Sequence, residues 1–194
     1  SIYVNVNKEK TNSVLGEENK LIYGIPEITD ILCGMRFKIS PHSFYQVNPY
    51  MTERLYNKAL EFAGITENDT VLDVYCGIGT ISLAAAKAAK RVIGIEIVNQ
   101  AVEDARKNAE NNGIKNTVFY AESAENAVPK LIENGMRPDI AILDPPRKGS
   151  DEKTLSAIVS AEPKRIVYVS CNVSTLARDA AFLAEQGYYP IKCA

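Results

Sequence analysis

An apolar run that passes directly into a glycine turn places the strongest constraint on how this sequence folds. Residues 71–74 are Val-Leu-Asp-Val, the next five residues carry Gly77 and Gly79, and an apolar, alanine-rich run follows over 81–89. A buried strand, a tight turn and a helix in this order form the first unit of a nucleotide-binding α/β sheet. Glycine suits such a turn because it adopts backbone conformations that strain other residues and lets a ligand approach the main chain.

Two acidic residues accompany this unit. Asp73 comes at the end of the first strand, so we expect its carboxylate to face a ligand at the turn. Glu96 ends a second apolar run, 91–96, and follows Asp73 by 23 residues (96 − 73). This is near the spacing of about 20 at which an acid meets a ribose diol, so the two glycines and the two acids predict an adenosine-type site. The ordinary alternative for Glu96 is a surface acid that caps the next helix.

Apolar runs and helical patterns continue to alternate along the chain. Further strands are expected over 117–120, 139–143 and 165–169, and further helices over 101–112, 152–161 and 175–186. Apolar runs without internal alternation are typical of parallel strands that are buried on both faces. We therefore predict a Rossmann-like, doubly wound α/β fold with a mainly parallel sheet, whose ligands bind at the carboxyl ends of the strands.

The first 45 residues have a different pattern. Apolar and polar residues alternate over 2–7, and short strands are predicted over 21–23 and 35–40. A helix is expected from Pro49, with Asn48 as its N-cap, to Gly64. We predict a small β-rich piece over 1–45, the remnant of a larger domain, and an α/β domain over 46–194 that is truncated at its C-terminal end.

Composition excludes several classes of function. The net charge of −2 gives no overall basic field, so any contact with a polyanion must be local. Four cysteines without C-x-x-C spacing argue against a metal site and against a secreted disulfide framework. Neither an apolar run of about 18 residues nor a charged, apolar leader is present, so no membrane association is expected. We expect a cytoplasmic enzyme.

Polar or reactive residues follow each predicted strand. The carboxyl ends of parallel strands meet at one edge of a sheet, so we expect these residues to converge there. They are Asp73 and Tyr75, Glu96, Glu122 and Ser123, Asp144, and the run Ser170, Cys171 and Asn172.

The last two strands end in the most specific signals. Pro145 and Pro146 follow Asp144 and make a rigid loop that presents the acid to a ligand; the alternative is a simple turn. Cys171 precedes a helix expected to begin near Ser174, whose unpaired N–H groups favour a thiolate. The usual fate of a free cysteine, burial as a small apolar residue, suits the other three cysteines better.

Five segments resemble, in the same order, the motifs of a known family. They are Phe44-Tyr45-Gln46-Val47-Asn48, Asp73-Val74-Tyr75-Cys76-Gly77-Ile78-Gly79, Gly94-Ile95-Glu96, Asp144-Pro145-Pro146-Arg147-Lys148-Gly149 and the run from Ser170 to Asp179. Over about 43–187 the sequence resembles the catalytic domain of the S-adenosylmethionine-dependent RNA uracil-C5 methyltransferases, which make 5-methyluridine in ribosomal or transfer RNA. The resemblance implies a class I methyltransferase fold.

The resemblance also implies roles for single residues. Cys171 is implied to be the nucleophile that adds to C6 of uracil. An RNA substrate is implied, ribosomal RNA before transfer RNA, with the target nucleotide flipped out of its stack. S-adenosyl-L-methionine is implied as the cofactor, held by Gln46, Tyr75, Glu96 and Asp144, and further by Thr80 and Ser123.

Two features of the family have no counterpart in this sequence. The family places its catalytic base, a Glu, in a motif downstream of the last matched helix, and it carries an N-terminal RNA-binding module. We therefore expect the 194-residue chain to bind the cofactor but to turn over poorly.

Alternatives remain open at this point. Asp-Pro-Pro also resembles the acidic motif of N-methyltransferases that act on exocyclic amines and need no thiol, and a cofactor-binding or RNA-docking module without catalysis is a second alternative. A nicotinamide-binding site is less consistent with the sequence, because the glycine turn lacks the full G-x-G-x-x-G motif. Arg147, Lys148 and Arg178 are either phosphate contacts or ordinary solvated charges.

Overall fold

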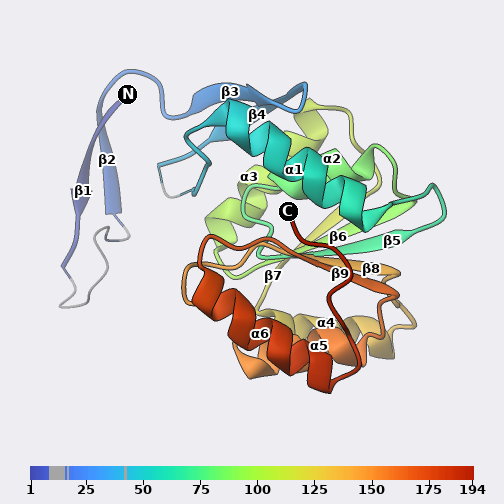
Figure 1. Cartoon of the computed structure of the whole chain (residues 1–194). Helices are drawn as coiled ribbons and strands as arrows, with labels where there is room; N and C mark the ends of the chain where they lie inside the picture. Colours follow the sequence, from blue (N-terminus) through green and yellow to red (C-terminus); the bar gives the residue numbers. More distant parts are fainter. Residues whose placement is uncertain (9–15, 17, 42) are drawn as a thin grey trace.

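A five-stranded parallel sheet forms the centre of the protein (Figure 1). The computed structural model describes residues 1–8, 16, 18–41 and 43–194. The strands are β5 (Thr70–Val74), β6 (Arg91–Glu96), β7 (Thr117–Ala121), β8 (Ile140–Leu143) and β9 (Arg165–Tyr168), in the order β7-β6-β5-β8-β9. The direction of strand addition reverses at β5, between β6 and β8, which is the switch point where doubly wound folds bind ligands. The predicted fold class is confirmed.

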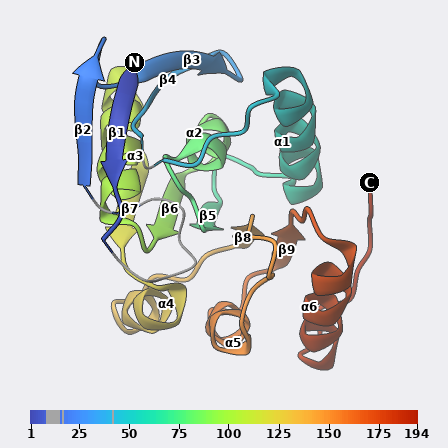
Figure 2. The ribbon, with the colours of Figure 1, turned by 90° about the vertical axis from the view of Figure 1, so that its left-hand side faces the viewer.

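Helices cover both faces of this sheet. They are α1 (Pro49–Ala63), α2 (Thr80–Ala86) and α3 (Asn99–Asn111) on one side, and α4 (Ala124–Glu133), α5 (Glu152–Ser160) and α6 (Val173–Glu185) on the other (Figures 1 and 2). Successive strand residues point to opposite faces, so Val71 packs in the first core and Leu72 in the second. The sequence pattern assigns no range to α4, in which Pro129 lies inside the helix. No helix in the described ranges is long and apolar enough to cross a membrane.

The predicted ends of α1 are confirmed. The side chain of Asn48 accepts a hydrogen bond from the N–H of Met51, which satisfies one of the free donors of the first turn. Gly64 ends the helix with φ of +54°, a left-handed conformation that glycine adopts without strain. The helix therefore begins and ends where its capping residues require.

Two antiparallel hairpins precede the α/β unit. They are β1 (Ile2–Val6) with β2 (Glu18–Tyr23), and β3 (Ile28–Leu32) with β4 (Met35–Ile39). The sequence pattern did not predict β3. Its two isoleucines, Ile28 and Ile31, are 54% and 59% exposed, so they do not form a buried face. The β1–β2 hairpin projects away from the sheet (Figure 1), whereas β4 packs in the core with α1, α2 and α3. The domain boundary near residue 45 stays a prediction.

Asn108 of α3 and the C-cap residue of this helix, Asn112, fasten β4 to the α/β unit. Asn108 accepts a hydrogen bond from the N–H of Lys38 (2.8 Å) and donates to its carbonyl (3.2 Å). Asn112, one turn later, makes the same pair of bonds with Arg36 (2.9 and 2.7 Å). Each side-chain amide therefore pairs with the strand as a neighbouring backbone would, and it satisfies an edge that is otherwise unpaired.

Asn108 is fully buried, so its removal is expected to be costly. We predict that Asn108→Ala lowers the free energy of unfolding by about 2 kcal/mol, because the polar groups of Lys38 lose their partner. Urea denaturation measures this change. Asn111→Ala, on the exposed side of the same helix, is the control and is expected to change stability by less than about 0.5 kcal/mol. Equal effects of the two substitutions would contradict the role of Asn108.

Candidate active site

The turn after β5 has the strained geometry that its glycines permit. Tyr75, Gly77 and Gly79 have φ of +67°, +53° and +85°. A Cβ on Gly79 would lie 2.8 Å from Cδ1 of Leu83, so this position has no room for a side chain. A Cβ on Gly77 would meet no described atom within 4 Å, so the turn faces open space at this residue. The turn thus leaves its backbone accessible to a ligand.

Glu96 joins this turn to the start of α3. One carboxylate oxygen accepts a hydrogen bond from the N–H of Gly77 (3.2 Å), and the other accepts from the N–H of Val98 (2.9 Å). Val98 is the N-cap residue of α3, so Glu96 contacts both the residue that precedes this helix and the glycine turn. The predicted convergence of Glu96 with the turn is therefore seen in the structure.

Asp73 corrects one expectation. Its side chain is fully buried and does not face the open side of the turn, because it points toward α2, where Ser82 donates a hydrogen bond to one of its oxygens. The other oxygen, Oδ1, has no hydrogen-bond partner among the described residues. A cofactor contact for Asp73 stays a prediction.

Burial shifts the titration of two acids near the sheet edge. Burial raises the pKa of Asp73 to about 7, and the nearby carboxylates of Asp144 and Glu96 add to the effect. Burial likewise raises the pKa of Asp144 to about 6. Asp144 follows Leu143, whose neighbour across the sheet is Val74, so these acids lie at the ends of adjacent strands.

The other predicted cofactor residues come from separate elements. Thr80 begins α2, and its hydroxyl shares a hydrogen bond of 3.1 Å with the hydroxyl of Tyr56, a buried α1 residue that the sequence did not single out. Ser123 is the N-cap residue of α4, and its side chain makes no capping bond. Gln46 lies half-buried in the segment between β4 and α1. Their contacts with a cofactor stay predictions.

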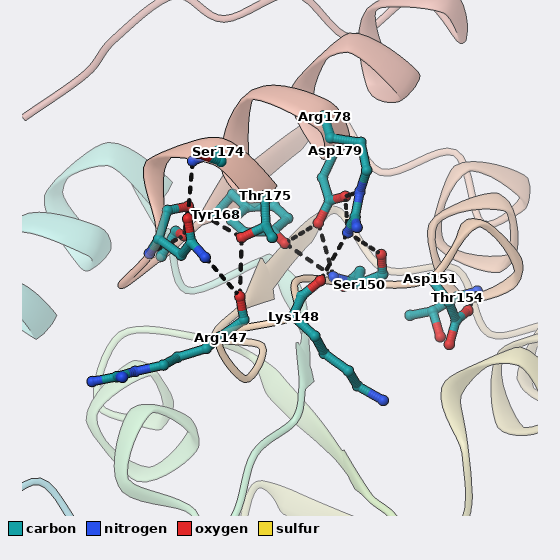
Figure 3. Close-up of polar contacts among 12 residues, drawn as sticks. Arg147, Lys148, Ser150, Asp151, Thr154, Tyr168, Ser174, Thr175, Arg178 and Asp179 are labelled. Carbon is teal, nitrogen blue, oxygen red and sulfur yellow. Dashed lines mark hydrogen bonds and ion pairs between the residues drawn. The ribbon is translucent and has the colours of Figure 1, made fainter.

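Cys171 is exposed and lies directly before α6. Asn172, the N-cap of this helix, accepts a hydrogen bond from the N–H of Ser174 (3.0 Å) and donates to the carbonyl of Arg147 (3.2 Å). Thr175 donates to the same carbonyl (3.3 Å). These bonds tie the loop after β8 to the first turn of α6, which begins two residues after Cys171. Figure 3 shows Thr175 of this turn beside Arg147 of the loop.

The remaining cysteines differ in their burial, and the three cations near Cys171 differ in their contacts. Cys76 is buried as predicted, whereas Cys193 is exposed and Cys33 is half-buried, so burial does not explain those two. Arg178 is held by Asp179 and by the carbonyls of the loop after β8. Its guanidinium is therefore fixed by the protein, although the side chain is 57% exposed, and the side chains of Arg147 and Lys148 are exposed as well.

The buried Asp73 predicts a pH-dependent stability. Its pKa rises from 3.8 in a model peptide to about 7 in the fold, so the unfolded chain releases this proton at lower pH. Its contribution to the free energy of unfolding is present at low pH and falls as the pH rises from about 4 to about 7, at up to about 1.4 kcal/mol per pH unit.

Asp73→Asn removes this ionisation and isolates its effect. We expect the variant to gain stability relative to the unsubstituted protein as the pH rises from about 5 to about 8, measured by urea denaturation across the range in which the group titrates. A stability difference that does not change with pH would show that Asp73 titrates normally.

Comparison with known proteins gives a consistent result. A family model described as tRNA (uracil-5-)-methyltransferase matches residues 28–187. An uncharacterized RNA methyltransferase of Enterococcus faecalis is 51% identical over 188 residues, which are 97% of this chain and 41% of that protein. A second, from Caldanaerobacter subterraneus, is 52% identical over 192 residues, 99% of this chain and 42% of that protein. The chain thus spans about two fifths of the length of these relatives.

A solved structure agrees with these matches. The tRNA (uracil-54, C5)-methyltransferase of Pyrococcus abyssi, in complex with S-adenosyl-L-homocysteine, is 31% identical and superposes with a TM-score of 0.75. The match covers 93% of this chain and 43% of that one. With the family model matching most of its length, the chain belongs to the tRNA (uracil-5-)-methyltransferase family.

Proposed function

We propose that this chain is the catalytic domain of an S-adenosylmethionine-dependent RNA methyltransferase that methylates C5 of a uridine. The observation that carries the proposal is the position of Cys171, an exposed thiol at the start of α6, on the same sheet edge as the glycine turn, Glu96 and Asp144. One edge thus offers a nucleophile together with a nucleoside-type site. The family description and the ligand of the Pyrococcus abyssi relative support it.

The described residues fit S-adenosylmethionine. The open space at Gly77 gives room beside the backbone, and Glu96 is fixed by two N–H groups, with lone pairs left to accept hydrogen bonds from a ribose diol. Asp144 and Tyr75 come from the neighbouring loops. We assign further contacts to Asp73, Gly79, Gln46, Thr80 and Ser123. When bound, S-adenosylmethionine supplies an electrophilic methyl group.

Cys171 has a defined task in this proposal. C5 of uracil is a weak nucleophile. The thiolate of Cys171 forms a bond to C6, and the C5=C6 electron pair moves onto C5 and the adjacent carbonyl. After C5 has gained the methyl group, a base removes the C5 proton, the double bond re-forms and the thiolate leaves. Covalent catalysis thus divides one difficult step into easier ones.

The substrate is proposed to be RNA. The target nucleotide must leave its stack to reach the sheet edge, at a cost of a few kcal/mol, and the exposed cations Arg147 and Lys148 lie on a loop beside Cys171, where phosphates could be bound. The sequence favoured ribosomal RNA, whereas the family description names transfer RNA, so both are substrates for the assay. The four cysteines, all in the described ranges, are free thiols, which fits the reducing cytoplasm that we propose as the location.

A trapping experiment tests the nucleophile. The protein is mixed with S-adenosylmethionine and with transfer or ribosomal RNA transcripts that contain 5-fluorouridine. Fluorine replaces the proton that must leave C5, so we expect a methylated protein–RNA adduct that survives a denaturing gel and maps to Cys171 by mass spectrometry. Cys171→Ser is expected to form none. Cys193→Ser, which removes another exposed thiol, is the control and is expected to react normally.

Other outcomes identify the alternatives. A protein that binds S-adenosylmethionine but forms no adduct with either RNA would contradict the proposal. Methylation of ordinary RNA that persists in Cys171→Ser would favour an N-methyltransferase. Binding without methylation or adduct would favour a cofactor-binding or RNA-docking module.

The proposed ribose contact makes a second prediction. We expect Glu96→Gln to weaken S-adenosylmethionine binding about tenfold, or about 1.4 kcal/mol, because hydrogen bonds to a charged acceptor are stronger than those to an amide. Isothermal titration calorimetry measures the change. Glu122→Gln is the matched control, since this acid follows the adjacent strand β7 and pairs with Lys130. If the two variants bind S-adenosylmethionine with equal affinity, Glu96 is not a cofactor contact.

A further inference from the structure

Asp179 has a buried carboxylate and is not one of the residues proposed to contact the cofactor. The residue lies in the second turn of α6 and is 1% exposed. A buried charge is costly unless ion pairs and hydrogen bonds compensate it. The partners of Asp179 therefore indicate what it holds together.

These partners tie the carboxylate to one loop (Figure 3). One oxygen accepts hydrogen bonds from the N–H of Ser150 (2.8 Å) and from the hydroxyl of Tyr168. The other accepts from the guanidinium of Arg178 (2.7 and 2.6 Å). The same guanidinium donates to the carbonyls of Lys148 and Ser150, both at 3.0 Å. Asp179 and Arg178 together hydrogen-bond the backbone of residues 148–150 and hold it in place.

Gly149 shows how closely the loop approaches this pair. Its φ is +75°, and a Cβ there would lie 2.5 Å from Oδ2 of Asp179 and 2.6 Å from Nη2 of Arg178. The loop backbone therefore lies directly against the ion pair.

The loop after β8, which Asp179 and Arg178 hold, also contacts the other parts of the proposed site. Its residue Arg147 accepts hydrogen bonds from Asn172 and Thr175 next to Cys171. The hydroxyl of Ser150 donates to the hydroxyl of Tyr75 in the glycine turn (3.2 Å). Through Ser150, the carboxylate of Asp179 thus connects the loop after β8, the turn after β5 and the helix that follows Cys171.

We infer that Asp179 is a positioning residue that fixes Cys171 relative to the cofactor side of the site. The inference rests on the proposed function. Reacting atoms must be held at close range in the correct orientation, and a displacement of about 1 Å costs about 100-fold in rate. Asp179 touches none of the proposed reactants and acts through the loop and α6.

The test is Asp179→Asn in this chain. The amide has the shape of the carboxylate but no charge, and its NH₂ group cannot accept from Ser150 or Arg178. At saturating S-adenosylmethionine and 5-fluorouridine RNA, we expect the first-order rate constant of adduct formation to fall at least about tenfold. The dissociation constant of S-adenosylmethionine, and the alkylation rate of Cys171 by iodoacetamide, are expected to change less than about twofold, because the cofactor residues and the thiol remain.

Asp151→Ala is the matched control. Its carboxylate follows the same loop but accepts from the N–H of Thr154 at the start of α5 (2.8 Å). Loss of this cap lowers thermal stability without releasing the loop from α6, so we expect an unchanged rate of adduct formation where the variant is folded. A slow Asp179→Asn beside a normal Asp151→Ala separates positioning from general destabilisation.

The failures are distinguishable. If the unsubstituted protein forms no adduct, the proposed function is contradicted, and the positioning role falls with it. If that protein reacts and folded Asp179→Asn reacts equally fast, the positioning role alone is wrong. Should Asp179→Asn not fold, Tyr168→Phe, which removes a single donor to Asp179, is expected to slow the reaction several-fold; an unchanged rate would overturn the inference.

Discussion

The parallel pairing of β5 with β6 and β8 is the constraint on which the rest of the structure depends. Val74 pairs with Ile95 on one side and with Leu143 on the other, so the chain leaves all three strands at the same level. Gly94 in β6 makes this close arrangement possible, because a Cβ there would lie 2.5 Å from the ring of Phe119 and 2.8 Å from the sulfur of Cys76. The turn after β5 can therefore lie low against the sheet, where Glu96 reaches its backbone.

Buried carboxylates have two different environments in this protein. Asp179 has the guanidinium of Arg178 and two further donors. For Asp73 and Asp144, no cation among the described residues offsets their burial, and their pKa values rise to about 7 and about 6. The first arrangement stabilises a fixed geometry. In the second, Asp73 is enclosed below the turn, and only the half-buried Asp144 leaves an acid at the sheet edge. An acid there matches a ligand that carries positive charge, as the proposed cofactor does on its sulfonium and ammonium groups.

Much of the architecture was predictable because its signals are local. Strand β6 has the predicted bounds, Arg91–Glu96, and α1 begins and ends at its capping residues. Features whose pattern is ambiguous were missed. In β3, Ile28 and Ile31 are exposed although they are apolar, so the pattern does not identify the buried face. In α4, Pro129 interrupts the helical pattern. In α4, packing of the buried face in the second core outweighs the local preference of Pro129. Strand β3, in contrast, pairs with β4 after a two-residue turn, so its pairing is local.

The sequence by itself determined the fold class, the glycine turn and the identity of the groups that follow each strand, because strand periodicity and turn chemistry depend on neighbours along the chain. Only the tertiary structure decided how those groups are used. Whether Asp73 faces solvent or α2, and whether Arg178 is free or bonded to the carbonyls of Lys148 and Ser150, depends on the packing of α2 and α6 against the sheet. The contacts of Arg178 with this loop join residues that are remote in sequence, and the orientation of Asp73 is set by burial, so no local pattern encodes either.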